Sequence, residues 1–413
     1  MIDTERCPPD LSAPGGNWAG SLRHRRLRTV NHPYEWSTTM LRDAALLQLE
    51  VTRRALGDGF ITKDATSFNV VFDGSRPVFI DVGSFEPLRT GEPWDGYRQF
   101  CELFLNPLVL QSIVGVPFQP WLRGAPDGIT PSELAPLLRG RHRLNRRLMV
   151  HVGLHARAER RYADSDAEHD VRGDLRRAGF GPNVLLAQLD NLERTVRSLE
   201  HGDSSSTWSD YSDRAHYDDA DLSTKEAAVR GAVERLGPTT VLDLGANDGR
   251  FSQLAVDHGA QHAIAVDSDH LVVDRLYRRL RDQDERRILP LVIDLTNPSP
   301  GIGWRNRERA PFTSRVDADL VLCLAVVHHL ALTDNVPFDM IVEFLADFDA
   351  PLVVEFPLPD DPMAARLLAR KRTGLFDHYD APGWEAALEQ RFEVTERTVL
   401  PSGRRVLYEA RPR

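Results

Sequence analysis

Lysine is scarce in this chain of 413 residues, because only three of its 51 basic side chains are lysines. These three are Lys63, Lys225 and Lys371. Cysteine is equally scarce, since Cys7, Cys101 and Cys323 lie far apart and form neither a zinc-binding spacing nor a disulfide framework. We therefore expect no metal site.

Long apolar runs are also missing. No stretch approaches the roughly 18 apolar residues of a membrane-spanning helix, so we predict no membrane association. The start of the chain shows neither an export signal nor an organelle signal, which predicts a cytoplasmic location. A formal net charge of -10 disfavours nucleic acid as a partner. A globular protein of two domains, each with its own core, is the expectation for this length.

The composition changes near residue 202, where "HGDSSSTWSDYSDRAHYDDADLS" is polar and acidic. We place a domain boundary there and expect an N-terminal domain over 1–201 and a second domain over 202–413. Just upstream, "PNVLLAQLDNLERTVRSLEHG" has the three-and-four spacing of a helix with one buried stripe. Its apolar positions are Leu185, Leu189, Leu192, Val196 and Leu199.

The second domain has the rhythm of a parallel sheet. Short apolar runs alternate with helical or polar segments in "TTVLDLG", "HAIAVDSD", "ILPLVIDLT", "ADLVLCLAVV" and "PLVVEFP". The chain then closes with two alternating runs around Pro401, Ser402 and Gly403, which predicts an antiparallel hairpin at the sheet edge. This domain is therefore predicted to be α/β.

A glycine-rich turn follows the first of these strands, in "VLDLGANDGRF". Glycine at 245 and 249 lets backbone approach a ligand at the mouth of a helix. A dinucleotide fingerprint would need glycine at 247 and 250, but the chain has Asn247 and Arg250. One strand later, "AIAVDSD" ends in Asp267, where a carboxylate can accept hydrogen bonds from both hydroxyls of a ribose.

From Trp208 to Arg413 these motifs together resemble the Rossmann-like S-adenosylmethionine-dependent methyltransferases. The resemblance implies a mostly parallel seven-stranded sheet with a C-terminal antiparallel hairpin, beside an N-terminal α+β domain. Asn247 departs from the family's middle glycine. Asp294 is implied to contact the adenine, or else it forms an Asx turn. Trp208, Tyr211, Tyr217 and Lys225 either cover the cofactor, with Lys225 on its carboxylate, or anchor the linker. The implied cofactor-binding set is Asp243, Gly245, Asn247, Gly249, Asp267, Ser268, Asp294, Leu295, Leu324, Ala325, Trp208, Tyr211, Tyr217 and Lys225.

Methyl transfer needs alignment of the nucleophile and removal of its proton. His328 and His329 follow the fourth strand, where ligands gather at the carboxyl ends of parallel strands. Either imidazole can act as a base near neutral pH, or can simply pack or cap the next helix. We favour His329 and expect Glu355, at the end of the next strand, to orient it. Trp304, in "GIGWRNRER", either lines this pocket or packs against the domain.

The N-terminal domain contains "KDATSFNVVFDGSRPVFIDVGSFE" after a helix predicted from Ser37 to about Leu56. Two strands flank a four-residue connection, Asp73 to Arg76. The segment 37–115 locally resembles the lower lobe of protein and aminoglycoside kinases, which implies roles for Asp64, Asn69 and Asp81 in holding a hydroxyl and magnesium. No lysine precedes Lys63, so the phosphate-clamping lysine is missing and phosphotransfer is the least favoured function. Two other interpretations remain: a reused, inactive lobe that holds a substrate or partner, or a local role in which Asp64 and Asn69 cap turns while Asp81 ends a strand.

The two-domain layout of the chain, together with the segments "GEPWDGYRQF" and "VEFPLPDD", also resembles that of bacterial methyltransferases related to a nodulation protein. We therefore expect methyl transfer to a hydroxyl, in preference to an amine, of a small molecule or sugar in specialised metabolism. A non-catalytic cofactor-binding scaffold and an RNA methyltransferase are the alternatives. The arginine run from Arg139 to Arg161 is either a solvated helix face or a receiver of anionic substrate or RNA.

Overall fold

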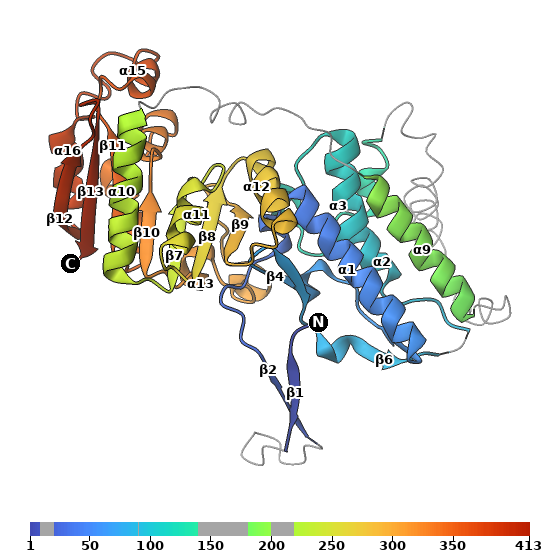
Figure 1. Cartoon of the computed structure of the whole chain (residues 1–413). Coiled ribbons are helices and arrows are strands. Elements are labelled where there is room, and N and C mark those ends of the chain that lie inside the picture. The colour runs from blue at the N-terminus through green and yellow to red at the C-terminus, as the bar shows by residue number, and fades with distance from the viewer. Residues whose placement is uncertain (9–19, 90, 139–180, 200–218) are drawn as a thin grey trace. The chain divides into compact units, whose positions relative to one another are not determined.

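The computed structural model of the chain describes residues 1–8, 20–89, 91–138, 181–199 and 219–413 (Figure 1). The chain forms two compact units. Unit 1 comprises Met1–Tyr34 and Thr38–Gly202, and unit 2 comprises Glu35–Ser37 and Asp203–Arg413. The arginine run and the linker aromatics Trp208, Tyr211 and Tyr217 lie outside the described residues.

Unit 1 combines short antiparallel strand pairs with helices. The pairs are β1 (Thr4–Cys7) with β2 (Ser21–His24), β3 (Phe60–Thr62) with β6 (Phe85–Pro87), and β4 (Val70–Asp73) with β5 (Arg76–Phe79). The helices are α1 (Thr38–Gly57), α2 (Tyr97–Phe100), α3 (Asn106–Val109), α4 (Gln119–Gly124), α5 (Pro131–Leu134) and α9 (Pro182–Ser198). Two π-helical segments, η4 (Cys101–Leu105) and η5 (Leu110–Val114), continue α2 and α3 into one helical run.

Both long helices of unit 1 form where the apolar spacing predicted them. α1 ends at Gly57, and the predicted stripe of α9 is buried along its length. The two helices pack together, and the Arg53 guanidinium donates to Asp190 at 2.9 Å and to Glu193 at 2.7 Å. The predicted four-residue connection was too long, because Asp73 pairs directly with Arg76. Gly74, with φ 60°, supplies the left-handed residue that this two-residue turn requires.

Unit 2 is built on one seven-stranded sheet with the order β12-β13-β11-β10-β7-β8-β9. The strands are β7 (Thr240–Leu244), β8 (His262–Asp267), β9 (Ile288–Val292), β10 (Leu320–Cys323), β11 (Leu352–Pro357), β12 (Phe392–Val399) and β13 (Arg405–Pro412). β7 to β11 are parallel, and β13 runs antiparallel to both β11 and β12. The predicted mostly parallel sheet with a closing hairpin is confirmed. The third strand, however, ends at Val292 rather than at Asp294.

Helices cover both faces of this sheet. On one face, α10 (Asp219–Leu236), α11 (Arg250–Asp257) and α12 (His270–Asp282) bury their apolar stripes against β7, β8 and β10. On the other face, Phe356 of β11 stacks on Trp384 at 5.5 Å between ring centroids, and Phe338 meets both rings edge-on. The remaining helices are α13 (Phe312–Arg315), α14 (Phe338–Ala346), α15 (Pro362–Leu368) and α16 (Ala381–Leu388).

Candidate active site

The glycine turn after β7 has a backbone that few residues can adopt. Gly245 and Gly249 both have φ 76°. A Cβ on Gly245 would lie 2.4 Å from Val326 Cγ2, and a Cβ on Gly249 would lie 2.8 Å from Leu276 Cδ1. Asn247, where the family has glycine, also has a left-handed φ of 48°, which asparagine tolerates better than most residues. The turn therefore keeps its shape without the middle glycine.

The carboxylate of Asp267 is tied to this turn. Its Oδ2 accepts from the Asn247 amide at 3.0 Å, and its Oδ1 accepts from the Asp269 amide at 2.9 Å. Burial raises the pKa of Asp267, while these amides act to lower it. A carboxylate has about four acceptor positions, so Asp267 retains acceptor capacity for a ligand's hydroxyl groups.

Asp243 lies beneath the turn and is buried. The Ser252 hydroxyl donates to its Oδ2 at 2.7 Å, which joins β7 to the first turn of α11. Burial raises the pKa of Asp243 to about 6, against the effect of the Ser252 hydrogen bond. Asp243 thus holds the strand and helix on either side of the turn in register.

The end of β9 presents more exposed groups. Asp294 is exposed, and its Oδ1 accepts from the Thr296 amide at 2.9 Å and the Thr296 hydroxyl at 2.7 Å. This is the Asx turn that the sequence offered as an alternative to an adenine contact. Leu295 beside it is half-buried, and Ser268 after β8 is exposed.

Two histidines follow β10. Leu324 and Ala325 lead from the strand, and Ala325 has a left-handed φ of 55°. His328 is fully buried, and within the described part of the chain neither of its ring nitrogens has a hydrogen-bond partner. His329 begins the π-helical turn η9 (His329–Thr333), and its ring centroid lies 4.0 Å from that of His328. Burial and the Arg405 charge lower the pKa of His329 to about 4, and burial lowers the pKa of His328 well below its usual range.

A buried ion network lies beside the histidines. The Lys225 ammonium donates to Glu355 Oε2 at 2.8 Å, and Arg405 Nη1 donates to Glu355 Oε1 at 3.0 Å. Arg405 Nε also donates to Asp361 Oδ2 at 2.7 Å. All four side chains are almost inaccessible. Although burial acts to raise the pKa of Glu355, the charges of Lys225 and Arg405 hold it below the usual value.

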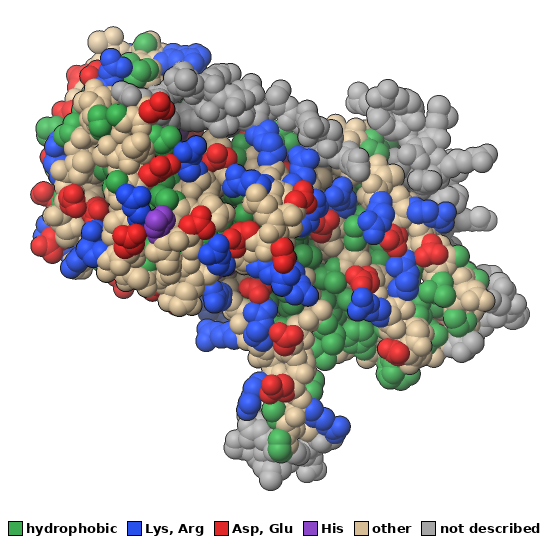
Figure 2. Space-filling view, in the orientation of Figure 1, with side chains coloured by type: hydrophobic (Ala, Val, Ile, Leu, Met, Phe, Trp, Pro, Cys, Tyr) green, Lys and Arg blue, Asp and Glu red, His purple; other side chains and the backbone are tan. Residues whose placement is uncertain are grey.

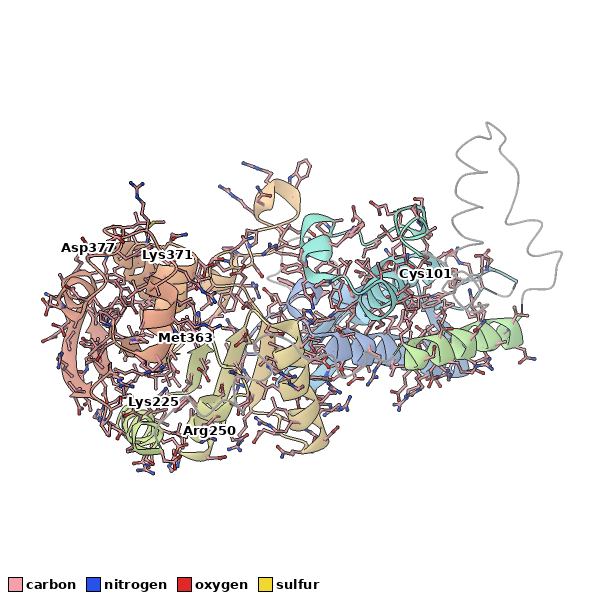
Figure 3. The ribbon with its side chains drawn as sticks, turned by 90° about the horizontal axis from the view of Figure 1, so that it is seen from above. Cys101, Lys225, Arg250, Met363, Lys371 and Asp377 are labelled. Atoms are coloured by element: carbon pink, nitrogen blue, oxygen red, sulfur yellow. The ribbon has the colours of Figure 1, made fainter. Side chains whose placement is uncertain are left out.

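This network differs from the roles expected for two of its members. Glu355 was expected to orient His329, but each of its oxygens accepts a hydrogen bond from a cation. Lys225 was expected at a cofactor carboxylate, but its ammonium is buried against Glu355 and lies 5.4 Å from the centroid of the Phe251 ring. Figure 3 labels Lys225 on α10 and Arg250 at the start of α11. Both side chains therefore help to hold α10, β11 and β13 together at the edge of the site.

Sequence reasoning missed Arg405 and Asp361. Asp361 precedes Pro362 and caps α15 by accepting from the Met363 and Ala364 amides, so its position carried a recognisable helix-start signal. Arg405 is buried at the start of β13, and its charge among the apolar residues of that strand was the available hint.

In unit 1, the kinase-like residues come together around the β4–β5 hairpin. The Ile80 amide donates to the Asn69 carbonyl at 2.9 Å, and Ser84 Oγ donates to the Asp64 carbonyl at 3.3 Å. The Asp81 side chain accepts from the Gly83 amide at 3.1 Å, so it caps the turn η3 (Val82–Ser84). The local interpretation expected Asp81 to end a strand, but β5 ends at Phe79 and Asp81 caps the turn that follows.

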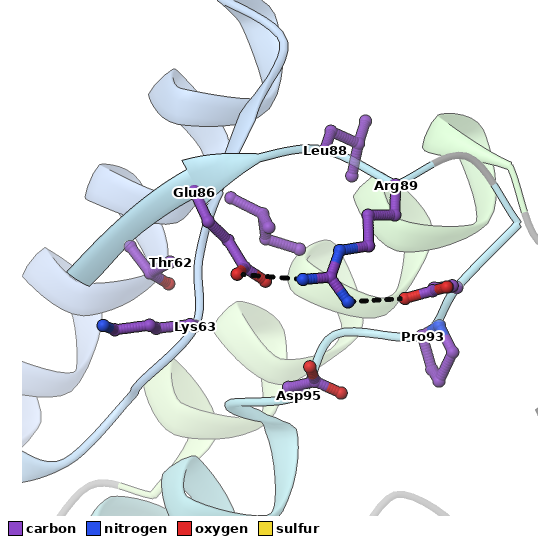
Figure 4. Close-up of a pocket in the computed structure, with 9 residues that line it drawn as sticks. Thr62, Lys63, Glu86, Leu88, Arg89, Pro93 and Asp95 are labelled. Carbon is purple, nitrogen blue, oxygen red and sulfur yellow. Dashed lines mark ion pairs between the residues drawn. The ribbon is translucent and has the colours of Figure 1, made fainter.

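A small pocket lies beside β3 and β6 (Figure 4). Arg89 projects between Glu86 and Glu92, 3.6 Å from a carboxylate oxygen of each, while Lys63 and Asp95 also line the pocket. The lining carries charges of both signs and is not a concentrated anion site.

Charges are also mixed on the visible surface, where acidic and basic side chains are interspersed (Figure 2). Within the described ranges, no three histidine, cysteine, aspartate or glutamate side chains are grouped to hold a metal ion. Nor does any helix of those ranges have the length and apolar character that crossing a membrane requires.

The strand order, the closing hairpin and the glycine turn together define the Rossmann-like methyltransferase fold. The chain is 36% identical over 410 residues to the nodulation protein NoeA of Rhizobium meliloti (strain 1021), and the match spans 99% of this chain and 85% of that protein. It therefore belongs to the NoeA family, which confirms the predicted relation to a nodulation protein. No family model matches the sequence.

Solved structures give weaker matches. The N-methyltransferase NodS from Bradyrhizobium japonicum WM9, in complex with S-adenosyl-L-homocysteine, is 12% identical, and the match covers 50% of this chain and 99% of NodS, with a TM-score of 0.36. The bifunctional kinase-methyltransferase WbdD is 16% identical, and the match covers 49% of this chain and 41% of WbdD, with a TM-score of 0.34.

Proposed function

We propose that unit 2 binds S-adenosylmethionine and transfers its methyl group to a hydroxyl, in preference to an amine, of a small molecule or sugar. The observation that carries this proposal is the Asp267 carboxylate, held against the glycine turn at the carboxyl edge of a sheet with the methyltransferase strand order. Parallel sheets of this type bind ligands at that edge.

The residues present fit such a cofactor. Asp267 retains acceptor positions for ribose hydroxyls, and Gly245 brings no side chain of its own into a turn where an added Cβ would lie 2.4 Å from Val326 Cγ2. The two unpartnered ring nitrogens of buried His328, within the described ranges, offer a donor and an acceptor to a bound molecule. When bound, the cofactor would supply a methyl group carried on a positively charged sulfur, and demethylated cofactor would be the leaving group.

In this proposal His329 takes the proton of the acceptor hydroxyl. Its lowered pKa leaves the imidazole neutral at pH 7, which is the state that can accept a proton. A pKa of about 4 also makes it a weak base, so in-line positioning of the acceptor contributes most of the acceleration. In this proposal Glu355 and Lys225 hold the surrounding helix and strands in place and take no part in methyl transfer.

Cofactor binding and turnover are tested separately. Calorimetry should detect S-adenosylmethionine binding to the full chain, and the absence of binding would reject the proposal. Demethylated cofactor should form only when an acceptor from a panel of sugars, phenols and amines is supplied. Binding without turnover across the whole panel would favour the scaffold alternative. Acceptor activity confined to RNA would favour the RNA methyltransferase alternative.

A further inference from the structure

The connection between β9 and α13 contains a closed loop, residues 301–309, that we name the indole loop. Ile302 and Arg309 form an antiparallel bridge at its base, each amide donating to the other's carbonyl at 3.0 Å. At the tip, the Trp304 amide donates to Glu308 Oε2 at 3.1 Å. Hydrogen bonds within the loop therefore fix both its base and its tip.

The indole loop also adopts a backbone that costs conformational energy. Arg305 and Asn306 are consecutive left-handed residues, with φ 56° and 57°, and such conformations cost about 1 kcal/mol each. A Cβ on Gly301 would lie 2.3 Å from the Asn306 carbonyl oxygen, and one on Gly303 would lie 2.3 Å from a Glu308 oxygen. Strained conformations persist where the surroundings fix them, and they cluster at ligand-binding sites.

This fixed loop displays an unusual set of side chains. Trp304 is 80% exposed, the highest value among the exposed large hydrophobic residues in the described ranges. Arg305 and Arg307 are exposed beside it, and among the residues that the structure describes neither guanidinium has an acidic partner. Arg309, in contrast, pairs with Glu308 at 3.3 Å. The loop thus presents one indole ring and two uncompensated positive charges, so the packing role considered for Trp304 does not apply.

We propose that the indole loop binds a short anionic saccharide. The apolar C–H face of a sugar ring stacks on the indole, and a carboxylate or sulfate on that sugar accepts hydrogen bonds from Arg305 or Arg307. The loop contains a single aromatic residue, which suits one sugar ring rather than a series of stacked bases. The net charge of -10 acts against long polyanions, so the ligand is short. Binding of this saccharide does not depend on methyl transfer.

The test uses the full chain without cofactor. Titration calorimetry with trigalacturonate, against neutral maltotriose, should show binding of the acidic sugar only. Trp304→Ala should weaken binding at least tenfold, Trp304→Phe should retain part of it, and Arg305→Gln/Arg307→Gln should remove the preference for the acidic sugar. Met340→Ala, at a second exposed apolar side chain of unit 2, is the control and should bind normally.

Two results would overturn the inference. The first is that the Trp304→Ala variant binds trigalacturonate as tightly as the unaltered chain does, or that the unaltered chain does not bind it at all. The other is Trp304-dependent binding of phosphatidylglycerol vesicles or oligothymidylate in preference to trigalacturonate, which would assign the loop to a membrane surface or a nucleic acid. Thermal unfolding of each variant identifies any loss that arises from misfolding.

Discussion

Two carboxylates, Asp81 just past β5 in unit 1 and Asp267 at the end of β8 in unit 2, occupy different environments. Asp81 follows a two-stranded hairpin and accepts from an amide two residues later, so its contact is local. Asp267 ends a strand within a seven-stranded sheet and accepts from Asn247, which belongs to a different strand-to-helix turn. In a parallel sheet the turns that follow several strands lie along the same edge, whereas an isolated hairpin has no such edge. Of these two carboxylates, only Asp267 thus contacts a turn that belongs to another strand.

The largest expected effect concerns the base. His329→Ala should lower turnover by about 10²-fold, the low end of the range for loss of a general base, because a pKa of about 4 makes His329 a weak base. Cofactor affinity should stay nearly unchanged, because the ribose contact proposed for Asp267 belongs to another strand. Single-turnover kinetics with calorimetry on the same preparation measures both quantities. An unaltered rate would remove His329 from the mechanism.

The glycine turn should be the next most sensitive feature. Gly245→Ala should destabilise unit 2 by about 3 kcal/mol, because it combines a left-handed φ with a contact 2.4 Å from Val326. Gly231→Ala is the matched control, since Gly231 lies within α10 and a Cβ there would meet nothing within 4 Å. This control should be neutral or stabilising by up to about 1 kcal/mol. Urea unfolding compares the two, and equal stabilities would contradict the strained turn.

Substituting Asp81 and Asp267 in turn tests the comparison directly. Asp267→Asn should weaken S-adenosylmethionine binding by about 10- to 100-fold, the equivalent of one or two hydrogen bonds to a charged group. Asp81→Asn should leave this affinity unchanged. Calorimetry under identical conditions compares the two variants. Magnesium-dependent phosphate transfer from labelled ATP that Asp81→Asn abolishes would instead assign unit 1 a chemistry of its own.

The last expected effect is a pH dependence of stability. The pKa of His329 is about 4 in the folded chain, below the ordinary value of 6.5. The unfolded chain therefore binds more protons between these values, and folding stability should fall as pH drops from 6.5 towards 4. Above pH 6.5 this contribution is fully present. Urea unfolding at several pH values should show a weaker dependence in His329→Gln, and an identical dependence would exclude this origin.

Much of the fold could be predicted because periodicity is a local property. The stripe of α9, the end of α1 and the run of parallel strands each follow from residues close in sequence. The errors were local too: the β4–β5 turn is shorter than predicted because Asp73 pairs with Arg76, and β9 ends before Asp294 because that residue enters an Asx turn.

Local sequence was enough to specify the sheet, the positions of Gly245 and Asp267, and the histidines after β10. Their surroundings came from packing between distant segments. Lys225 and Glu355 are 130 positions apart, and Arg405 meets Glu355 across 50 positions, so their pairing depends on how α10, β11 and β13 pack. Likewise, the exposure of Trp304 depends on a loop closed between Ile302 and Arg309. Spacing places a side chain at a strand end or in a loop, whereas packing assigns its neighbours.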